Sequence, residues 1–95
     1  MFKVKDKTNR EIRLTKERWS HINEEHPEIA QHIEDIKETL KTPFKIISYN
    51  DDENVKYYYK YLKNRKPTAK YLLLIVKYLN GEGFIITAYF VKNIK

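Results

Sequence analysis

The chain has 95 residues, of which 41% are hydrophobic, and a net charge of +6 at pH 7. A chain of this length supports one core, so we expect a single domain spanning residues 1–95. It has no cysteine, which excludes disulfides, thiolate chemistry and cysteine-based zinc or iron–sulfur sites. The longest apolar run, residues 71–76, is too short to cross a bilayer, and the first residues do not form a secretory signal. We therefore expect a cytoplasmic protein.

The positive charge is concentrated in the C-terminal half. Residues 1–43 contain nine Lys or Arg and nine Asp or Glu, whereas residues 44–95 contain ten Lys or Arg and four Asp or Glu. A one-sided positive field favours a polyanion and speeds its association. The charge distribution therefore favours a nucleic acid as the partner.

The chain opens with the pattern of a hairpin followed by a helix. Residues 2–5 and 11–14 alternate apolar and charged side chains, as strands with one buried face do. Thr15 then has the chemistry of a helix N-cap, because its hydroxyl accepts a free N–H of the first turn. Pro27 disfavours helical backbone at His26, so the first helix is expected to end there.

A second helix and four strands are predicted after Pro27. The helix is expected over residues 27–41, where an apolar stripe recurs at helical spacing. The stripe consists of Ile29, Ile33, Ile36 and Leu40. The predicted strands are residues 44–49, 55–62, 70–79 and 84–92, with a basic loop at 63–69. We expect an α+β fold in the order ββααββββ, with two helices packed on one face of a curved antiparallel sheet.

The register of the last hairpin follows from its apolar positions. A loop with an odd number of residues, Gly81–Gly83, places the apolar side chains of the two strands on the same face of the sheet. A loop with an even number of residues buries Lys77 without a partner. Burying an unpaired ammonium costs on the order of several kcal/mol, so we expect the odd loop. Lys77, Thr87 and Tyr89 then share the opposite face. The apolar sets are Leu72, Leu74 and Val76 on one strand and Phe84, Ile86, Ala88 and Phe90 on the other.

Short motifs along the chain resemble those of the phage-associated barnase–EndoU–colicin–RelE-like (BECR) nucleases. The matching segments, in the family's order, are WSHI at 19–22, HPE at 26–28, YYYK at 57–60, LLLIVK at 72–77 and IITAYF at 85–90. The resemblance implies helices on a curved antiparallel sheet that carries a metal-independent ribonuclease site without a cofactor. The candidate catalytic residues that it implies are His21, His26, Lys77, Thr87 and Tyr89.

These residue types suit RNA cleavage without a metal. The 2′-hydroxyl attacks the phosphate, which requires a base, an acid for the leaving 5′-oxygen, and donors for the charged phosphorane. Histidine serves as base or acid, lysine supplies charge, and hydroxyl groups donate hydrogen bonds. Tyrosines and cations of the C-terminal half are expected to bind the RNA. The expected nucleic-acid-binding residues are Tyr57, Tyr59, Lys60, Arg65, Lys66, Lys70 and Lys92.

Each candidate also has an ordinary structural explanation. His26 can be a packed or capping residue, His21 a surface residue, and Lys77 an edge lysine that discourages sheet pairing. His21, His26 and His32 are spaced too unevenly to share a helical face, so no metal site is expected.

We therefore expect a toxin-type ribonuclease that leaves a 2′,3′-cyclic phosphate and is inhibited by an acidic antitoxin or immunity protein. A non-catalytic RNA- or DNA-binding domain and a protein-interaction module remain the alternatives.

Overall fold

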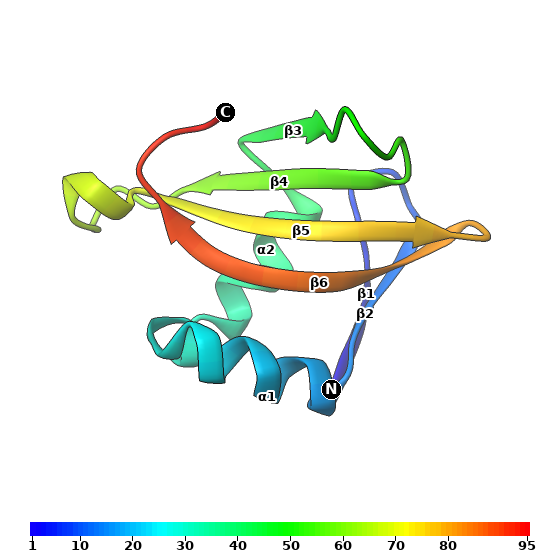
Figure 1. Ribbon diagram of the computed structural model, residues 1–95, viewed down its shortest axis with the longest axis horizontal. Coiled ribbons are helices and arrows are strands. Elements are labelled where there is room, and N and C mark those ends of the chain that lie inside the picture. The colour runs from blue at the N-terminus through cyan, green and yellow to red at the C-terminus, as the bar shows by residue number, and fades with distance from the viewer.

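The computed structural model describes all residues, 1–95, and begins with a hairpin that leads into a helix (Figure 1). The hairpin consists of β1, Phe2–Lys5, and β2, Glu11–Leu14, at the predicted positions. Helix α1 spans Lys16–Glu25. Its N-cap is Thr15, whose hydroxyl accepts a backbone N–H of the first turn at 3.1 Å. The helix ends at His26, as predicted from the proline that follows.

The predicted helix over residues 27–41 consists of two segments. Pro27–Gln31 forms a 3-10 helix, and α2 spans Ile33–Lys41, with His32 between them. The prediction of one continuous helix is wrong, because the N–H groups of Ile29 and His32 bond to carbonyls three residues back. The apolar stripe nevertheless faces inward. Ile29, Ile36 and Leu40 are fully buried, and Ile33 is partly buried against them.

Four further strands complete a six-stranded sheet in the order β1-β2-β6-β5-β4-β3 (Figure 1). They are β3, Lys45–Ser48; β4, Val55–Tyr61; β5, Tyr71–Leu79; and β6, Glu82–Val91. The fold is α+β, as predicted, but the sheet is mixed. β2 runs parallel to β6 where Ile12 and Arg13 lie opposite Gly83 and Phe84. The expectation of a wholly antiparallel sheet is therefore wrong.

The β5–β6 hairpin has the two-residue loop Asn80–Gly81, in place of the predicted Gly81–Gly83. Both loop residues have positive φ, 55° and 83°, which suits a tight hairpin turn. The alternation of faces shifts once along the hairpin, because a β-bulge leaves Ile86 unpaired between the pairs Ile75–Thr87 and Val76–Ile85. The bulge keeps Lys77 out of the core despite the even loop.

The bulge also moves two residues that were predicted to be in the core. Phe84 lies opposite Lys77, and Ile86 is half-buried. Ile85 takes their place in the core, while Ala88 is buried and Phe90 packs against the core as predicted.

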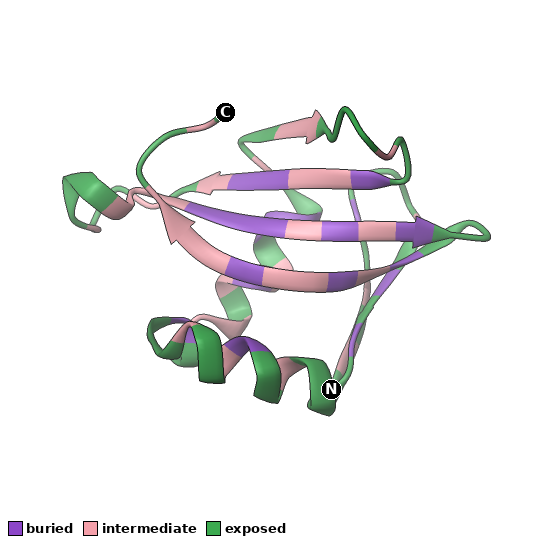
Figure 2. Ribbon diagram, in the orientation of Figure 1, coloured by how far each residue is buried: buried purple, intermediate pink, exposed green.

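The core lies between one sheet face and the helices. α2 packs behind β4 and β5, whereas α1 runs beside β6 (Figure 1). Buried and less buried positions alternate along parts of β5 and β6 (Figure 2), as expected for strands with one covered face. The alternation is interrupted where Tyr59 of β4 and Leu73 of β5, which lie opposite each other on the other face, are also buried. The strand residues in this core include Ile12, Leu14, Tyr58, Leu72, Leu74, Val76, Tyr78, Ile85 and Ala88. Neither α-helix is long and apolar enough to span a membrane.

Candidate active site

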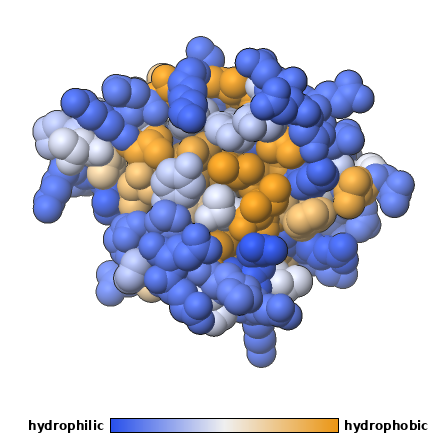
Figure 3. Space-filling model, viewed as in Figure 1, coloured by the Kyte–Doolittle hydropathy of each residue, from blue (hydrophilic) through white to orange (hydrophobic).

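The sheet has a second face, turned away from α2, which we call the open face. Strand register places Tyr57, Ile75 and Thr87 in one row across it, and Val55, Lys77 and Phe84 in the next. Several of these side chains are apolar, and Figure 3 shows an apolar area at the centre of this face with hydrophilic side chains around it. Exposed apolar patches with a polar rim are typical of binding surfaces.

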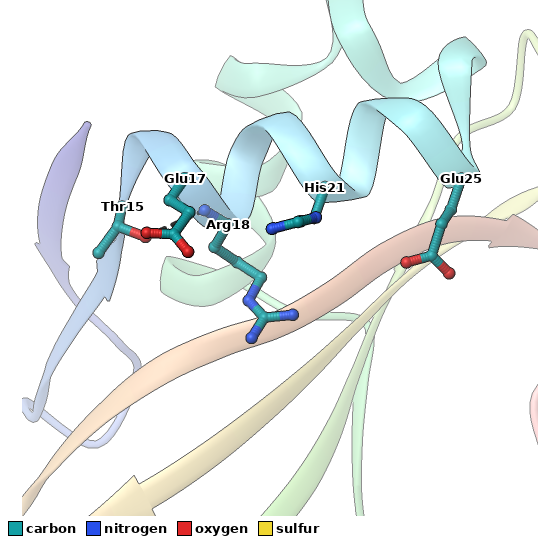
Figure 4. A pocket seen from close by; sticks show the side chains of 5 residues that line it. All are labelled: Thr15, Glu17, Arg18, His21 and Glu25. Carbon is teal, nitrogen blue, oxygen red and sulfur yellow. Dashed lines mark hydrogen bonds between the residues drawn. The ribbon is translucent and has the colours of Figure 1, made fainter.

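Helix α1 forms a wall beside β6. β2 pairs only with the beginning of β6, so α1 contacts the strand beyond that point. Arg18, His21 and Glu25 follow one another at spacings of three and four, which places them on one side of the helix. Arg18 and Glu25 extend from the helix toward β6, and the His21 ring lies between them (Figure 4).

Two neighbouring hollows follow this wall, and together we call them the α1–β6 groove. The first has a volume of about 420 Å³ and is lined only by polar residues. They are Thr15, Glu17, Arg18, His21 and Glu25. The second, about 280 Å³, shares Thr15 and Arg18 with the first. Its other residues are Arg13 of β2 and Phe84 and Ile85 of β6. The groove thus combines an imidazole, two guanidinium groups and two carboxylates.

The three candidate residues of the hairpin share the open face. Thr87 lies opposite Ile75, and Tyr89 lies opposite Leu73, on the face that also carries Lys77. At about 3.3 Å per residue, Thr87 is about 7 Å along the strand from Lys77, and Tyr89 is about 13 Å from it. One phosphate therefore cannot contact both Lys77 and Tyr89 without movement of their side chains.

Lys77 is held by an ion pair that the sequence did not indicate. Its Nζ lies 2.7 Å from Oδ2 of Asp52, and both side chains are about one-third exposed. The hydrogen bond from Lys77 is the main reason that the pKa of Asp52 lies below its usual value. A ligand phosphate at this position would compete with the Asp52 carboxylate.

The two candidate histidines have different surroundings. The His26 ring stacks on Tyr89, with centroids 4.8 Å apart and an interplanar angle of 17°, and its Nδ1 is 3.6 Å from Glu28. His21 is exposed in the α1–β6 groove beside Arg18. The structure thus brings His26 to Tyr89 and His21 to Arg18. Neither histidine forms a hydrogen bond or ion pair with Lys77.

The tyrosines and cations expected to bind RNA do not form one surface. Tyr57 lies on the open face and stacks on Tyr49, with centroids 5.7 Å apart. Tyr59 is only 1% exposed, so its ring cannot stack on a base. Burial raises the pKa of Tyr59, while a hydrogen bond from the Lys95 backbone opposes the shift. Lys60 lies on the other face, where its Nζ donates to Thr42 O at 3.1 Å.

The remaining expected binding residues are at one end of the sheet. Lys66 and Lys70 flank a short 3-10 turn, Pro67–Ala69, in the β4–β5 loop, and Lys92 follows β6 and is exposed. Arg65 is in the same loop and packs over the ring of Phe90.

Arg13 and Arg18 are candidate site residues that were missed. The signal for Arg18 is its spacing from His21 and Glu25, three and seven residues along one helix. Arg13 has no such signal, because it reaches the groove through the parallel pairing of β2 with β6.

No group of three or more His, Asp or Glu side chains is arranged to hold a metal ion.

Comparison with known proteins identifies the family of the chain. The chain matches the PBECR2 family, described as phage-Barnase-EndoU-ColicinE5/D-RelE like nuclease2, over residues 2–94. No curated protein and no solved structure matches the chain. Since the family match covers almost the whole chain, the protein belongs to the phage-associated barnase–EndoU–colicin–RelE-like nucleases.

Proposed function

We propose that the protein is a metal-independent ribonuclease and that the α1–β6 groove holds the phosphate that is cleaved. The observation that carries this proposal is that His21, two carboxylates and the Arg18 guanidinium line one hollow, and that Arg13 lines the adjoining hollow together with Arg18. Metal-free cleavage of a phosphodiester needs a base, an acid and positive charge at one place, and the groove contains all three types.

The reaction is a transesterification within the RNA. The 2′-oxygen forms a bond to phosphorus, the bond from phosphorus to the 5′-oxygen breaks, and a 2′,3′-cyclic phosphate remains. Glu25 or Glu17 takes the 2′-hydroxyl proton, and protonated His21 gives a proton to the leaving 5′-oxygen. Arg13 and Arg18 stabilise the doubly charged phosphorane.

The open face contributes the other candidate residues. Thr87 and Tyr89 donate hydrogen bonds to the RNA beside the cleaved phosphate, and His26 orients Tyr89 through the stacked contact. Lys77 binds a neighbouring phosphate after leaving Asp52. Tyr57 stacks on an unpaired base, and the exposed lysines at the end of the sheet attract the backbone.

A basic nuclease site of this kind is readily masked by carboxylates. An acidic antitoxin or immunity protein, acting in the cytoplasm, would place carboxylates in the α1–β6 groove and compete with RNA. Its association would weaken as salt concentration rises, because long-range attraction between charges is screened.

The direct test is incubation of the protein with total RNA and with tRNA in excess EDTA, followed by analysis of the ends. We expect cleavage with 2′,3′-cyclic phosphate ends. His21→Ala and Arg18→Ala are each expected to lower the rate by on the order of tenfold to a thousandfold, as when one transition-state donor is removed.

Lys16→Ala is the matched control. The substitution also removes one positive charge, but Lys16 lies about 160° around α1 from Arg18. It should cleave at nearly the wild-type rate. RNA that stays intact with wild-type protein, or a His21→Ala, Arg18→Ala double variant as active as wild type, would leave a nucleic-acid-binding domain without this chemistry.

A further inference from the structure

A second cluster of polar and aromatic side chains lies at the end of β6, away from the α1–β6 groove. At its centre is Phe90, which is contacted on two sides. The Arg65 guanidinium lies over its ring, 3.5 Å from the centroid, and the His32 ring meets it edge-on at 4.8 Å. Phe90 thus fixes the positions of one cation and one imidazole.

Arg65 is held in place without using its terminal amino groups. Its Nε donates to Ala69 O at 3.1 Å, and its plane is fixed by the stacking on Phe90. Neither Nη atom forms a hydrogen bond or an ion pair with the protein. A guanidinium held in this way is preorganised for two parallel hydrogen bonds to phosphate oxygens.

His32 is oriented by a carboxylate. Its Nδ1 lies 2.9 Å from Oδ2 of Asp35. An ionised carboxylate only accepts, so Nδ1 carries the hydrogen and Nε2 is left for a ligand. The pairing also occupies Asp35, the one acidic residue of this cluster.

These side chains border a hollow of about 280 Å³, which we call the Arg65 hollow. Its lining residues include Tyr61 and Lys63, in addition to His32, Asp35 and Arg65. Tyr61 belongs to a group of three aromatic rings in mutual contact, with centroid distances of 5.6 to 6.5 Å. The others are Tyr71 and Phe44, and Phe44 and Tyr61 are 62% and 41% exposed.

The charge around the hollow favours a polyanion. From Asn54 to Gly81 the chain contains Lys and Arg residues but no Asp or Glu. An exposed tyrosine and a fixed guanidinium that line one hollow suit an unpaired nucleotide, because the base can stack on the tyrosine ring while the phosphate binds the cation. Bases in a duplex are stacked on each other and cannot do this.

We propose that the Arg65 hollow binds one nucleotide of a single-stranded RNA outside the cleavage groove. The phosphate binds Arg65 and Lys63, and the base stacks on Tyr61. The inference rests on the proposed function, since it makes the hollow a second contact for the same substrate. Ile85 of the groove and Phe90 are five residues apart on β6, or about 16 Å, so only a substrate longer than a dinucleotide reaches both.

The test measures binding without cleavage. A fluorescein-labelled, single-stranded 2′-O-methyl oligonucleotide of about twelve nucleotides lacks the attacking hydroxyl, and its affinity is measured by anisotropy. Arg65→Ala and Tyr61→Leu are each expected to raise Kd by on the order of tenfold. Lys5→Ala, which removes an exposed charge on β1, is the control and should change Kd by less than about twofold.

A second measurement separates this hollow from the cleavage groove. With a cleavable oligonucleotide, Arg65→Ala should raise KM and leave kcat unchanged, whereas cleavage of a dinucleotide should not change at all. Because Arg65 also packs on Phe90, its alanine variant can fail to fold. In that case Tyr61→Leu and Lys63→Ala, which alter more exposed side chains, decide the question.

The outcomes distinguish the two proposals. Wild-type protein that cleaves RNA, with variants that bind the oligonucleotide as tightly as wild type, would overturn the Arg65 hollow alone. The proposed role of the hollow would also be overturned if the same variants lost equal affinity for a duplex of the same length, because such losses would show only a general attraction between charges. Binding that depends on Arg65 and Tyr61 without any RNA cleavage would overturn the proposed function and support the hollow.

Discussion

Replacement of Asp6 by alanine is expected to destabilise the fold by about 3 kcal/mol, because this carboxylate connects the first hairpin to the core. Asp6 is only 5% exposed. Its Oδ1 accepts the Thr8 N–H, the Thr8 hydroxyl and the Arg10 N–H at 2.7 to 3.0 Å. Its Oδ2 accepts the hydroxyls of Tyr58 and Tyr78 at 3.1 and 2.6 Å.

The magnitude follows from what remains after the carboxylate is removed. The hydroxyl oxygens of Tyr58 and Tyr78 are buried and lie within hydrogen-bond distance of each other, so without Asp6 one hydroxyl can donate to the other, whose own hydrogen is left without an acceptor. An unsatisfied buried donor costs about 1–3 kcal/mol, and the lost bonds to a charged group add a similar amount. The backbone donors of the turn regain part of this from water. A loss of about 3 kcal/mol corresponds to a fall of roughly 12–24 °C in Tm for a domain of this size.

Urea denaturation followed by circular dichroism is the appropriate assay, with Asp51→Ala as control because Asp51 is an exposed carboxylate. Asp51→Ala should change the free energy of unfolding by less than about 0.5 kcal/mol. Adding Tyr58→Phe and Tyr78→Phe to Asp6→Ala removes the stranded hydroxyl and should recover about 1–2 kcal/mol. If Asp6→Ala were no more destabilising than Asp51→Ala, the hydrogen-bond argument would be refuted.

The same carboxylate predicts how stability depends on acid. Burial alone would raise the pKa of Asp6, but hydrogen bonds from Tyr78, Thr8, the Arg10 backbone and Tyr58 outweigh it and lower the pKa below 3.8. Since the folded-state pKa is the lower one, this stability is present above about pH 4 and is lost as the pH falls through the folded value. Asp6→Ala should therefore flatten the acid limb of the stability curve.

Three further predictions concern Tyr58, Gly83 and Lys77. Burial raises the pKa of Tyr58 from 10.0 to about 12. Because the folded-state pKa is the higher one, the stability that Tyr58 contributes is fully present below pH 10 and is lost as the pH rises from 10 to 12. Tyr58→Phe should therefore flatten the alkaline part of the curve of unfolding free energy against pH. Gly83→Ala should cost about 1–3 kcal/mol in urea unfolding, because the new Cβ would lie 2.7 Å from Cδ1 of Ile12. Because Lys77 is proposed to bind a phosphate beside the cleaved one, Lys77→Ala should lower kcat/KM for RNA by about tenfold, mainly through a higher KM. Asp52→Ala, which releases the lysine, should raise kcat/KM by about a few-fold. Unchanged kcat/KM in both variants would exclude Lys77 from the site.

Local chemistry explains why several elements could be predicted from the sequence. The alternation at residues 2–5 and 11–14 gives strands at those positions, and Thr15 caps the first helix. These features depend on side chains and backbone groups a few residues apart. The helix over 27–41 was predicted less accurately, because an apolar stripe at spacings of three and four does not distinguish a 3-10 turn from an α-turn at Pro27–Gln31.

Features that depend on distant residues were missed or explained wrongly. The parallel pairing of β2 with β6 has no local signal, and the bulge at Ile86 replaced the odd loop that the sequence favoured. The cost of burying Lys77 was nevertheless the correct constraint. The chain satisfies it by adding a residue within the strand, and sequence alone does not distinguish that solution from a longer loop.

The candidate site follows the same division. Arg18, His21 and Glu25 share a helix, so helical spacing alone would have grouped them. By contrast, the ion pair of Lys77 with Asp52 joins residues 25 positions apart. Tyr59, which is buried, is contacted by the backbone of Lys95, far along the chain. The groove beside α1 gathers more of the groups that phosphodiester cleavage needs than the face that carries Lys77 does. It follows that α1 is the better place to look for the loss of activity, and that the sheet face is the better place to look for loss of substrate affinity.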